Sequence, residues 1–126
     1  KIVFKQFETL SKKQSIRHQQ PILTIKMERG GYVYILTNYN NSVLYTGVTS
    51  NINNRLFEHK NNTHPNSFTS KYNVKKLIFI KAFCTINEAI DFEKYVKRKS
   101  RKFKINLIGK SNPVWKGLEE LVKNWD

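Results

Sequence analysis

The stretch Gly31-Tyr-Val-Tyr-Ile-Leu-Thr-Asn38, followed five residues later by Val43-Leu-Tyr-Thr-Gly-Val48, decides the fold. Both runs are rich in β-branched and aromatic residues, and the Tyr-Asn-Asn-Ser segment between them is typical of a turn. Alternation along the first run places Tyr32, Tyr34 and Leu36 on one face and its Val and Ile residues on the other. The two runs therefore predict an antiparallel hairpin.

Downstream of the hairpin, the hydrophobic period changes from that of a strand to that of a helix. Asn51 is a favoured N-cap residue, and the segment after it has helical periodicity. One stripe of this expected helix carries Ile52, Arg55, Leu56 and His59. Residues 61–73 have no such pattern and are expected to form a loop, and residues 76–83 are expected to form a third strand.

More helices are expected after the third strand. Thr85-Ile-Asn-Glu88 is a capping box, which predicts a helix that runs to about residue 98. Two further short helices are expected, at 102–108 and at 118–125. Gly109 and the Asn112-Pro113 pair are expected to end the first of these. The order of elements predicts an α+β domain with a small antiparallel sheet and helices packed around it.

Composition limits the class of partner. The chain has 126 residues, enough for one domain, with 23 Lys and Arg against 9 Asp and Glu, a net charge of +14. Such an excess favours nucleic acid as the partner. The two Trp, six Tyr and eight Phe supply a core, so the chain is not a disordered basic tail. A single cysteine, Cys84, excludes an intrachain disulfide framework and indicates a cytoplasmic protein.

The first residues differ from the rest. The only methionine, Met27, comes just before the hairpin, so residues 1–26 are expected to be an N-terminal extension or an artificial segment, and 27–126 the domain. An N-terminal arm lying across nucleic acid is the alternative. Without residues 1–26 the chain keeps 17 basic and 8 acidic residues. The longest uncharged run, residues 30–54, is interrupted by polar residues, so no membrane span is expected.

Glu93 does not fit a pure packing account. Helical periodicity places it near the middle of an apolar face, which is formed by Ile86, Ala89, Ile90 and Val96. Isolated burial of a charge is costly, so this carboxylate must be paired, hydrogen-bonded or bound to a metal. The pattern is equally compatible with a buried salt bridge to a Lys or Arg and with a functional carboxylate.

Arg55 and His59 raise a similar question, because they stand four residues apart and so share one helix face. An ordinary amphipathic edge accounts for each of them alone. Together, a guanidinium and an imidazole aimed at one spot suit a phosphate group and its proton transfers.

Two tyrosines are expected to face each other on the hairpin. Tyr34 and Tyr45 lie on adjacent strands, and Gly47 follows Tyr45 on the same face. A glycine inside a strand allows close approach of a ligand or another backbone. Cross-strand aromatic packing explains the same pattern, and spacing alone does not separate the two.

In this order, these residues resemble the landmarks of the GIY-YIG nuclease superfamily. The landmarks are Tyr32-Val33-Tyr34, Tyr45-Thr46-Gly47, Arg55, His59, Glu93 and Asn112. The likeness covers about residues 30–116. In type it is similar to small single-domain bacterial proteins related to the nuclease module of the excision-repair incision subunit. Tyr32 stands where the family name has Gly, and Thr46 where it has Ile.

The resemblance implies metal-dependent hydrolysis of a DNA phosphodiester bond on a three-stranded antiparallel sheet flanked by helices. It implies that Glu93 holds a single Mg²⁺ or Mn²⁺ and that Arg55 binds the scissile phosphate. It also implies that Tyr34 or Tyr45 helps to activate water, with His59 relaying the proton and Asn112 orienting the site. A free tyrosine has a pKa of about 10, so it needs nearby positive charge to act as a base near neutrality.

The remaining positive charge predicts a track for the nucleic-acid backbone. Its candidates are Lys71, Lys75, Lys76, Arg98, Lys99, Arg101 and Lys102. Backbone contacts carry no sequence information, so cutting is expected to depend on DNA structure or on a protein partner. A DNA endonuclease is the leading hypothesis; a catalytically idle nucleic-acid-binding module and a small RNA-binding protein are the alternatives. The presence together of Tyr34, Tyr45, Arg55, His59 and Glu93 favours the enzyme, because a binder has no need for a carboxylate that repels phosphate.

Overall fold

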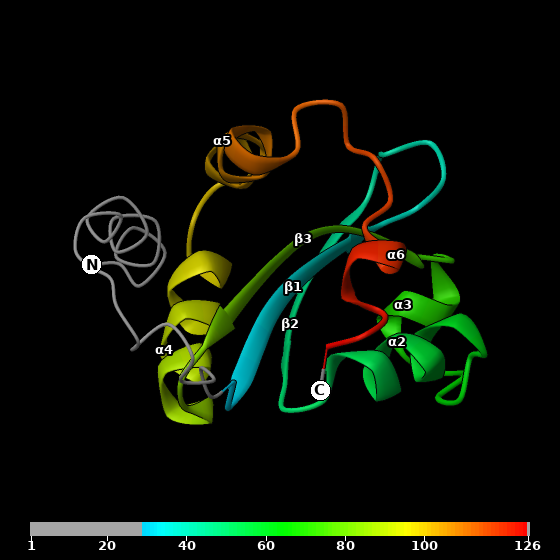
Figure 1. The fold of residues 1–126 in the computed structure, drawn as a ribbon. Coiled ribbons are helices and arrows are strands. Elements are labelled where there is room, and N and C mark those ends of the chain that lie inside the picture. Colours follow the sequence, from blue (N-terminus) through cyan, green and yellow to red (C-terminus); the bar gives the residue numbers. More distant parts are fainter. Residues whose placement is uncertain (1–28, 126) are drawn as a thin grey trace.

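The computed structural model describes residues 29–125 and arranges them in three layers around one small sheet (Figure 1). The strands are β1 (Gly31–Thr37), β2 (Leu44–Thr49) and β3 (Lys76–Phe83), all antiparallel, in the order β2-β1-β3. The predicted α+β class, the hairpin and the third strand are confirmed. Because β1 is central, β2 is an edge strand with one side open to a ligand.

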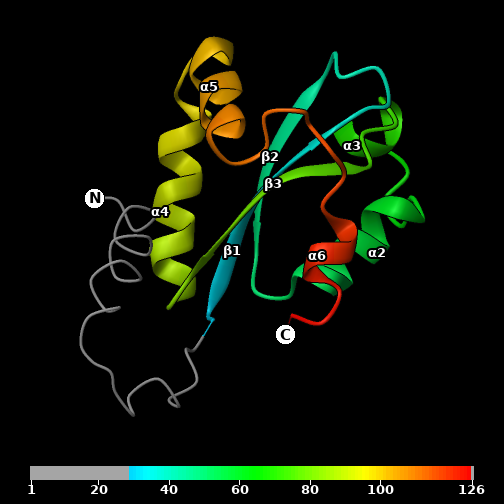
Figure 2. The ribbon, with the colours of Figure 1, turned by 45° about the horizontal axis from the view of Figure 1, so that its top comes forward.

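Helices cover both faces of the sheet (Figure 2). On one side lie α4 (Ile86–Lys97) and α5 (Arg101–Ser111), and on the other lie α2 (Ile52–Lys60), α3 (Phe68–Lys71) and α6 (Glu119–Val122). The predicted N-caps are confirmed, because the side chains of Asn51 and Thr85 each accept a hydrogen bond from a backbone N–H in the first turn of α2 and of α4.

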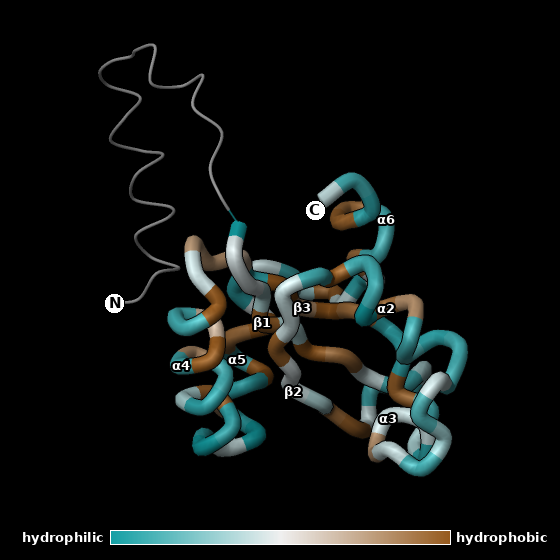
Figure 3. The backbone as a smooth tube through the Cα atoms, turned by 90° about the horizontal axis from the view of Figure 1, so that it is seen from below, coloured by the Kyte–Doolittle hydropathy of each residue, from teal (hydrophilic) through white to brown (hydrophobic). Residues whose placement is uncertain are grey.

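The alternation along β1 divides the core into two sides, as predicted. Tyr32, Tyr34 and Leu36 are fully buried on the α2 side, whereas Val33 and Ile35 are buried on the side of α4 and α5. Figure 3 shows the hydrophobic strands enclosed by helices whose outer turns are hydrophilic. The sheet is therefore packed on both faces.

Two local predictions were wrong. The segment expected to be a loop over 61–73 contains the short helix α3, which Ser67 caps by accepting from the backbone N–H of Ser70. Gly109 does not end α5; the helix continues through it to Ser111, and Asn112 is the C-cap. The buried neighbour Ile108 anchors this last turn, which outweighs the low helix propensity of glycine.

The expectation for residues 1–26 concerns a segment outside the described residues. Within residues 29–125, no helix is long and apolar enough to cross a bilayer.

Candidate active site

The edge strand β2 carries the two tyrosines into contact. Tyr34 on β1 pairs with Gly47 on β2, and its ring lies 6.3 Å from the ring of Tyr45, measured between centroids. A Cβ added at Gly47 would lie 2.4 Å from Cζ and Oη of Tyr34, so no other residue fits there without displacing the ring. The glycine of the second motif thus makes room for the tyrosine of the first motif.

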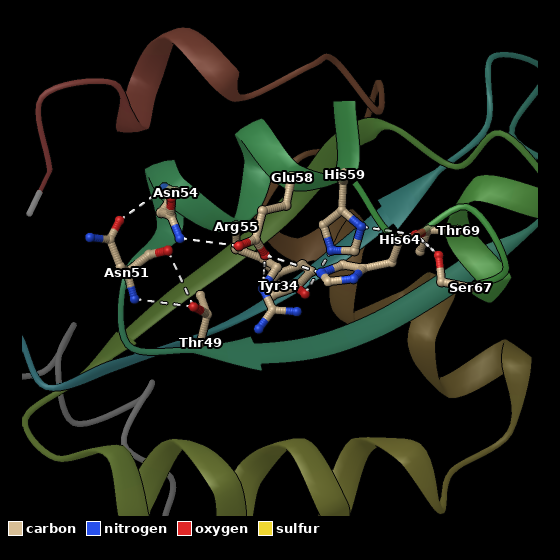
Figure 4. A network of polar contacts seen from close by, with 10 residues as sticks. All are labelled: Tyr34, Thr49, Asn51, Asn54, Arg55, Glu58, His59, His64, Ser67 and Thr69. Carbon is tan, nitrogen blue, oxygen red and sulfur yellow. Dashed lines mark hydrogen bonds and ion pairs between the residues drawn. The ribbon is translucent and has the colours of Figure 1, made fainter. Parts of the chain in front are cut away.

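Helix α2 brings His59 onto the Tyr34 hydroxyl (Figure 4). Tyr34 Oη lies 3.0 Å from Nε2 of His59, and Nδ1 of the same ring lies 2.9 Å from Oγ1 of Thr69 on α3. Thr69 Oγ1 lies 3.3 Å from the Ser67 hydroxyl. A hydrogen-bonded chain therefore runs from the buried tyrosine through the imidazole to the start of α3.

The surroundings of Tyr34 hold it in the protonated state. Burial raises the pKa of its hydroxyl above the usual value, and Tyr45 adds to the rise. The Arg55 guanidinium lowers the pKa, whereas the Glu93 and Glu58 carboxylates raise it further. Two consequences follow: Tyr34 is a hydrogen-bond donor at neutral pH, and the charges of Arg55 and Glu93 both act on its hydroxyl.

The surroundings of His59 hold it neutral. Burial lowers the pKa of its imidazole, and the neighbouring Arg55 lowers it further, against an opposing effect of Glu58. A neutral imidazole has one donor and one acceptor nitrogen. The ring therefore donates one of its two hydrogen bonds, to Tyr34 or to Thr69, and accepts the other.

Arg55 lies beside this chain, four residues before His59 on the same face of α2. Its Nε is 3.4 Å from Oε1 of Glu58, and its side chain is 37% exposed. Within the described part of the chain, the terminal guanidinium nitrogens of Arg55 have no ion-pair partner. They are the groups that a phosphate would meet.

A pocket of about 170 Å³ adjoins these residues on the α2–α3 side. Tyr45, Arg55 and His59 line it from β2 and α2, and the segment 67–70 closes it from α3. Tyr45 is half-buried and lines this pocket, so its side chain is accessible to solvent, whereas Tyr34 is fully buried.

Glu93 lies on the opposite face of the sheet from Arg55 and His59, because α4 packs against β1 and β2 on that face. It is buried between Ala89 and Val96 on the inner face of α4, as the periodicity predicts. Its Oε2 pairs with Nζ of Lys97 at 2.6 Å. Among residues 29–125 that lysine, half exposed to solvent, is its only ion-pair or hydrogen-bond partner.

A lone carboxylate limits the kind of metal ion that the site fits. Residues 29–125 contain no group of three or more His, Cys, Asp or Glu side chains able to hold a metal together. Zinc takes three or four protein ligands, whereas Mg²⁺ keeps several waters and uses one or two carboxylates with substrate phosphate oxygens. Glu93 therefore fits Mg²⁺ or Mn²⁺ bound together with a substrate.

Asn112 is placed apart from this cluster, in the loop after α5. Its amide donates to the backbone carbonyls of Ile78 and Lys116, and its Oδ1 accepts from the Lys116 N–H. These contacts join the end of α5 to β3. These hydrogen bonds explain why the Asn112 side chain is buried, and they indicate a structural role.

The basic candidates form two groups on opposite sides of the sheet. Lys71, Lys75 and Lys76 run from α3 into β3, and the Lys76 ammonium donates to the Asn41 side chain. The second group, Arg98, Lys99, Arg101 and Lys102, is exposed around the α4–α5 junction.

Sequence reasoning missed the part played by α3. Thr69 fixes the His59 ring, and Phe68 stacks on Tyr45 with ring centroids 6.1 Å apart. The available signal was Ser67, a favoured N-cap residue followed by an apolar one, but four residues are too few for a periodicity.

Comparison with known proteins confirms the family resemblance. Residues 30–106 match the model of the GIY-YIG catalytic domain. The chain is 35% identical over 82 residues to a UPF0213 protein of Syntrophus aciditrophicus (strain SB). This alignment covers 65% of this chain and 92% of that protein. It is 36% identical over 83 residues to a UPF0213 protein of Autographa californica nuclear polyhedrosis virus, over 65% of this chain and 78% of that protein. The solution NMR structure of a UPF0213 protein from Bacillus halodurans is similar to 72% of this chain, with 28% identity, 95% of that chain covered and a TM-score of 0.46.

Proposed function

This chain belongs to the GIY-YIG catalytic domain family, and on that premise we propose that it is a metal-dependent endonuclease that hydrolyses phosphodiester bonds of DNA. The proposal is supported by the pocket that Tyr45, Arg55 and His59 line, with the Tyr34 hydroxyl hydrogen-bonded to His59. Arg55 lies on one face of the sheet and Glu93 on the other, and their charges act in opposite directions on the pKa of the Tyr34 hydroxyl, after the larger effect of burial. A phosphate needs a cation to bind its oxygens, and a divalent metal needs a carboxylate.

Arg55 has the role of phosphate ligand. Glu58 engages only its Nε, which leaves the two terminal nitrogens to bind the substrate phosphate. A planar guanidinium binds two phosphate oxygens at once and stabilises the charge that develops on them.

Tyr45 is the better candidate for contact with the attacking water. Tyr34 is fully buried, its hydroxyl is bonded to His59, and its pKa is raised. Tyr34 therefore stays protonated, whereas a general base must be deprotonated before it can accept the proton of the attacking water. Tyr45 borders the pocket together with Arg55, the proposed phosphate ligand. Tyr34 and His59 then position Tyr45 through the ring contacts that both make with it.

Glu93 would hold the divalent cation, which stabilises charge on the phosphoryl oxygens when bound. Without a cation, Lys97 neutralises the carboxylate. Because Lys97 is half exposed and stands at the end of α4, its ammonium can move into solvent at little cost.

Selection among DNA substrates is proposed to depend on structure. The exposed basic groups at the α4–α5 junction and near α3 suit the backbone, and backbone contacts do not distinguish sequences. A protein partner that supplies sequence specificity is compatible with this arrangement.

The test is a cleavage assay on plasmid, branched and flapped DNA and on RNA, with and without Mg²⁺. We expect DNA cleavage that requires Mg²⁺ and falls by about 10³-fold in Glu93→Ala, given the several kcal/mol that a metal supplies. Asp91→Ala is the matched control, because it removes an exposed carboxylate from the same helix.

The absence of Mg²⁺-dependent cleavage of every substrate by the wild-type protein would contradict the proposal. Metal-independent RNA binding without cleavage would instead support the RNA-binding alternative. Cleavage that persists undiminished in Glu93→Ala would leave the enzyme in place and contradict the metal site.

A further inference from the structure

The short helix α3 exposes an aromatic surface beside the candidate active site. Phe68 and Tyr72 are each 46% exposed, and their ring centroids lie 4.8 Å apart. Phe68 also stacks against Tyr45, with an angle of 25° between the ring planes. Three aromatic rings therefore run without interruption from the pocket wall to the surface.

Core packing does not account for the outer two rings. Tyr45 packs against the buried cluster on the α2 side of the sheet, but Phe68 and Tyr72 belong to none of the buried clusters of the described residues. A contiguous group of exposed aromatic side chains next to a pocket is typical of a binding surface rather than of a core.

Positive charge accompanies these rings. The ammonium of Lys71 lies 5.7 Å from the centroid of the Tyr72 ring, and Arg55 lines the same pocket as Phe68. Aromatic rings interleaved with cations suit a nucleic-acid strand, because the rings stack on bases while the cations neutralise phosphates.

The surface is also fixed with respect to the catalytic cluster. Ser67 caps α3, and Thr69 is buried with its hydroxyl on the His59 ring. Thr69, which contacts His59, and Phe68, which is exposed to solvent, are therefore neighbours on one helical turn. A base held on Phe68 would lie at the pocket that Arg55 also lines.

We propose that Phe68 and Tyr72 form a stacking platform for unpaired bases, and that this platform directs the enzyme to DNA with single-stranded nucleotides next to the scissile bond. The inference rests on the proposed function and names its substrate class. A base offers its ring face to a protein only when it is unstacked from its duplex neighbours. A fully paired duplex would therefore gain nothing from the platform.

The test measures binding without cleavage, in EDTA and without added metal. Labelled single-stranded oligonucleotides and blunt duplexes of the same sequence are titrated with wild-type protein and with a Phe68→Leu, Tyr72→Leu double variant, following fluorescence anisotropy. We expect the variant to lose about 10- to 100-fold in affinity for the single strand, and less than about twofold for the duplex.

Tyr39→Leu is the matched control, because it removes an exposed ring from the β1–β2 turn, and its affinity for the single strand should stay unchanged. A 2-aminopurine base in the single strand adds a direct readout: the wild-type protein should quench it and the double variant should not. Circular dichroism on each variant shows whether the fold is retained.

Equal losses on single strand and duplex, or no loss on either, would overturn the platform. A wild-type protein that binds both forms equally would overturn it too. These results do not depend on turnover, so a failure of the platform and a failure of the proposed nuclease activity are distinguishable.

Discussion

The two faces of the sheet contribute to the candidate site in different ways. On the α2 side, Tyr34, His59 and Thr69 form a continuous hydrogen-bonded chain with both imidazole nitrogens engaged. On the α4 side, Glu93 has one partner among the described residues, the mobile end of a half-exposed lysine. The residues on the α2 side are therefore held in place by hydrogen bonds within the fold. On the α4 side, the Glu93 carboxylate can exchange Lys97 for a metal ion.

The difference separates positioning from binding. A chain of buried hydrogen bonds fixes geometry before a substrate arrives, as preorganised electrostatic stabilisation requires. A carboxylate held only by a surface lysine is available to a cation brought with the substrate. Changes on the α2 side should therefore affect turnover and stability, and changes beside Glu93 should affect the metal requirement.

On the α2 side, a large effect is expected at Arg55. Arg55→Lys keeps the charge but loses the planar fork, so kcat/KM for DNA cleavage should fall by about 10²-fold. Lys60→Ala, which removes an exposed cation from the same helix, should stay within about threefold of wild type in the same steady-state assay. Equal losses in the two variants would mean that Arg55 contributes only general positive charge.

The two tyrosines should separate next. Tyr45→Phe should lower kcat by about 10²-fold, the usual contribution of a proton-transfer group. Tyr34→Phe should lower kcat by about tenfold or less, but cost about 1 to 2 kcal/mol of stability, because it leaves a half-buried imidazole nitrogen without its hydrogen-bond partner. Single-turnover cleavage and urea unfolding measure the two quantities. The reverse order of kcat losses would assign the water-activating role to Tyr34.

Removal of Lys97 tests the exchangeable partner of Glu93. Lys97→Ala should lower the Mn²⁺ concentration needed for half-maximal cleavage by about two- to fivefold, the equivalent of a partly exposed ion pair. Mn²⁺ binding followed by electron paramagnetic resonance should shift in the same direction in the presence of DNA. Lys94→Ala, at an exposed position on the same helix, is the control and should leave both values unchanged. A raised Mn²⁺ requirement in Lys97→Ala would show that the lysine helps, rather than competes with, the metal.

The smallest expected effect is a pH dependence of stability from His59. Its pKa is lowered in the folded state from 6.5, so below pH 6.5 the unfolded chain takes up the proton first. Stability from this group is complete above pH 6.5 and is lost as the pH falls below it. Urea unfolding between pH 8 and 5.5 should show this loss in wild type and in His64→Asn, but not in His59→Asn. A wild-type slope that survives in His59→Asn would assign the titration to another group.

The sequence predicted those features that depend on neighbours along the chain. The strands followed from alternation and β-branched residues, and the starts of α2 and α4 from the side chains of Asn51 and Thr85. The burial of Glu93 followed from helical periodicity, and its salt bridge was one of two open interpretations.

Features that depend on distant contacts were not predictable in this way. The bond between Tyr34 and His59 joins residues 25 positions apart, and the hold of Thr69 on the imidazole requires α3 to fold against α2. The three backbone bonds of Asn112 also depend on the loop that returns to β3. Local periodicity does not reveal such contacts. The resemblance therefore indicated Tyr34, His59 and Asn112 as site residues, but not the side chains and backbone groups that they contact.

If the two faces of the sheet act on one phosphate, Glu93 and Arg55 should be strongly coupled. The most direct measurement is a double-mutant cycle on kcat/KM for Mg²⁺-dependent DNA cleavage, with Glu93→Gln, Arg55→Lys and the combined variant. Groups that act as a unit are strongly non-additive. The combined variant should therefore be about as slow as the slower single variant. A combined loss equal to the product of the two single losses would contradict a phosphate shared by the two faces.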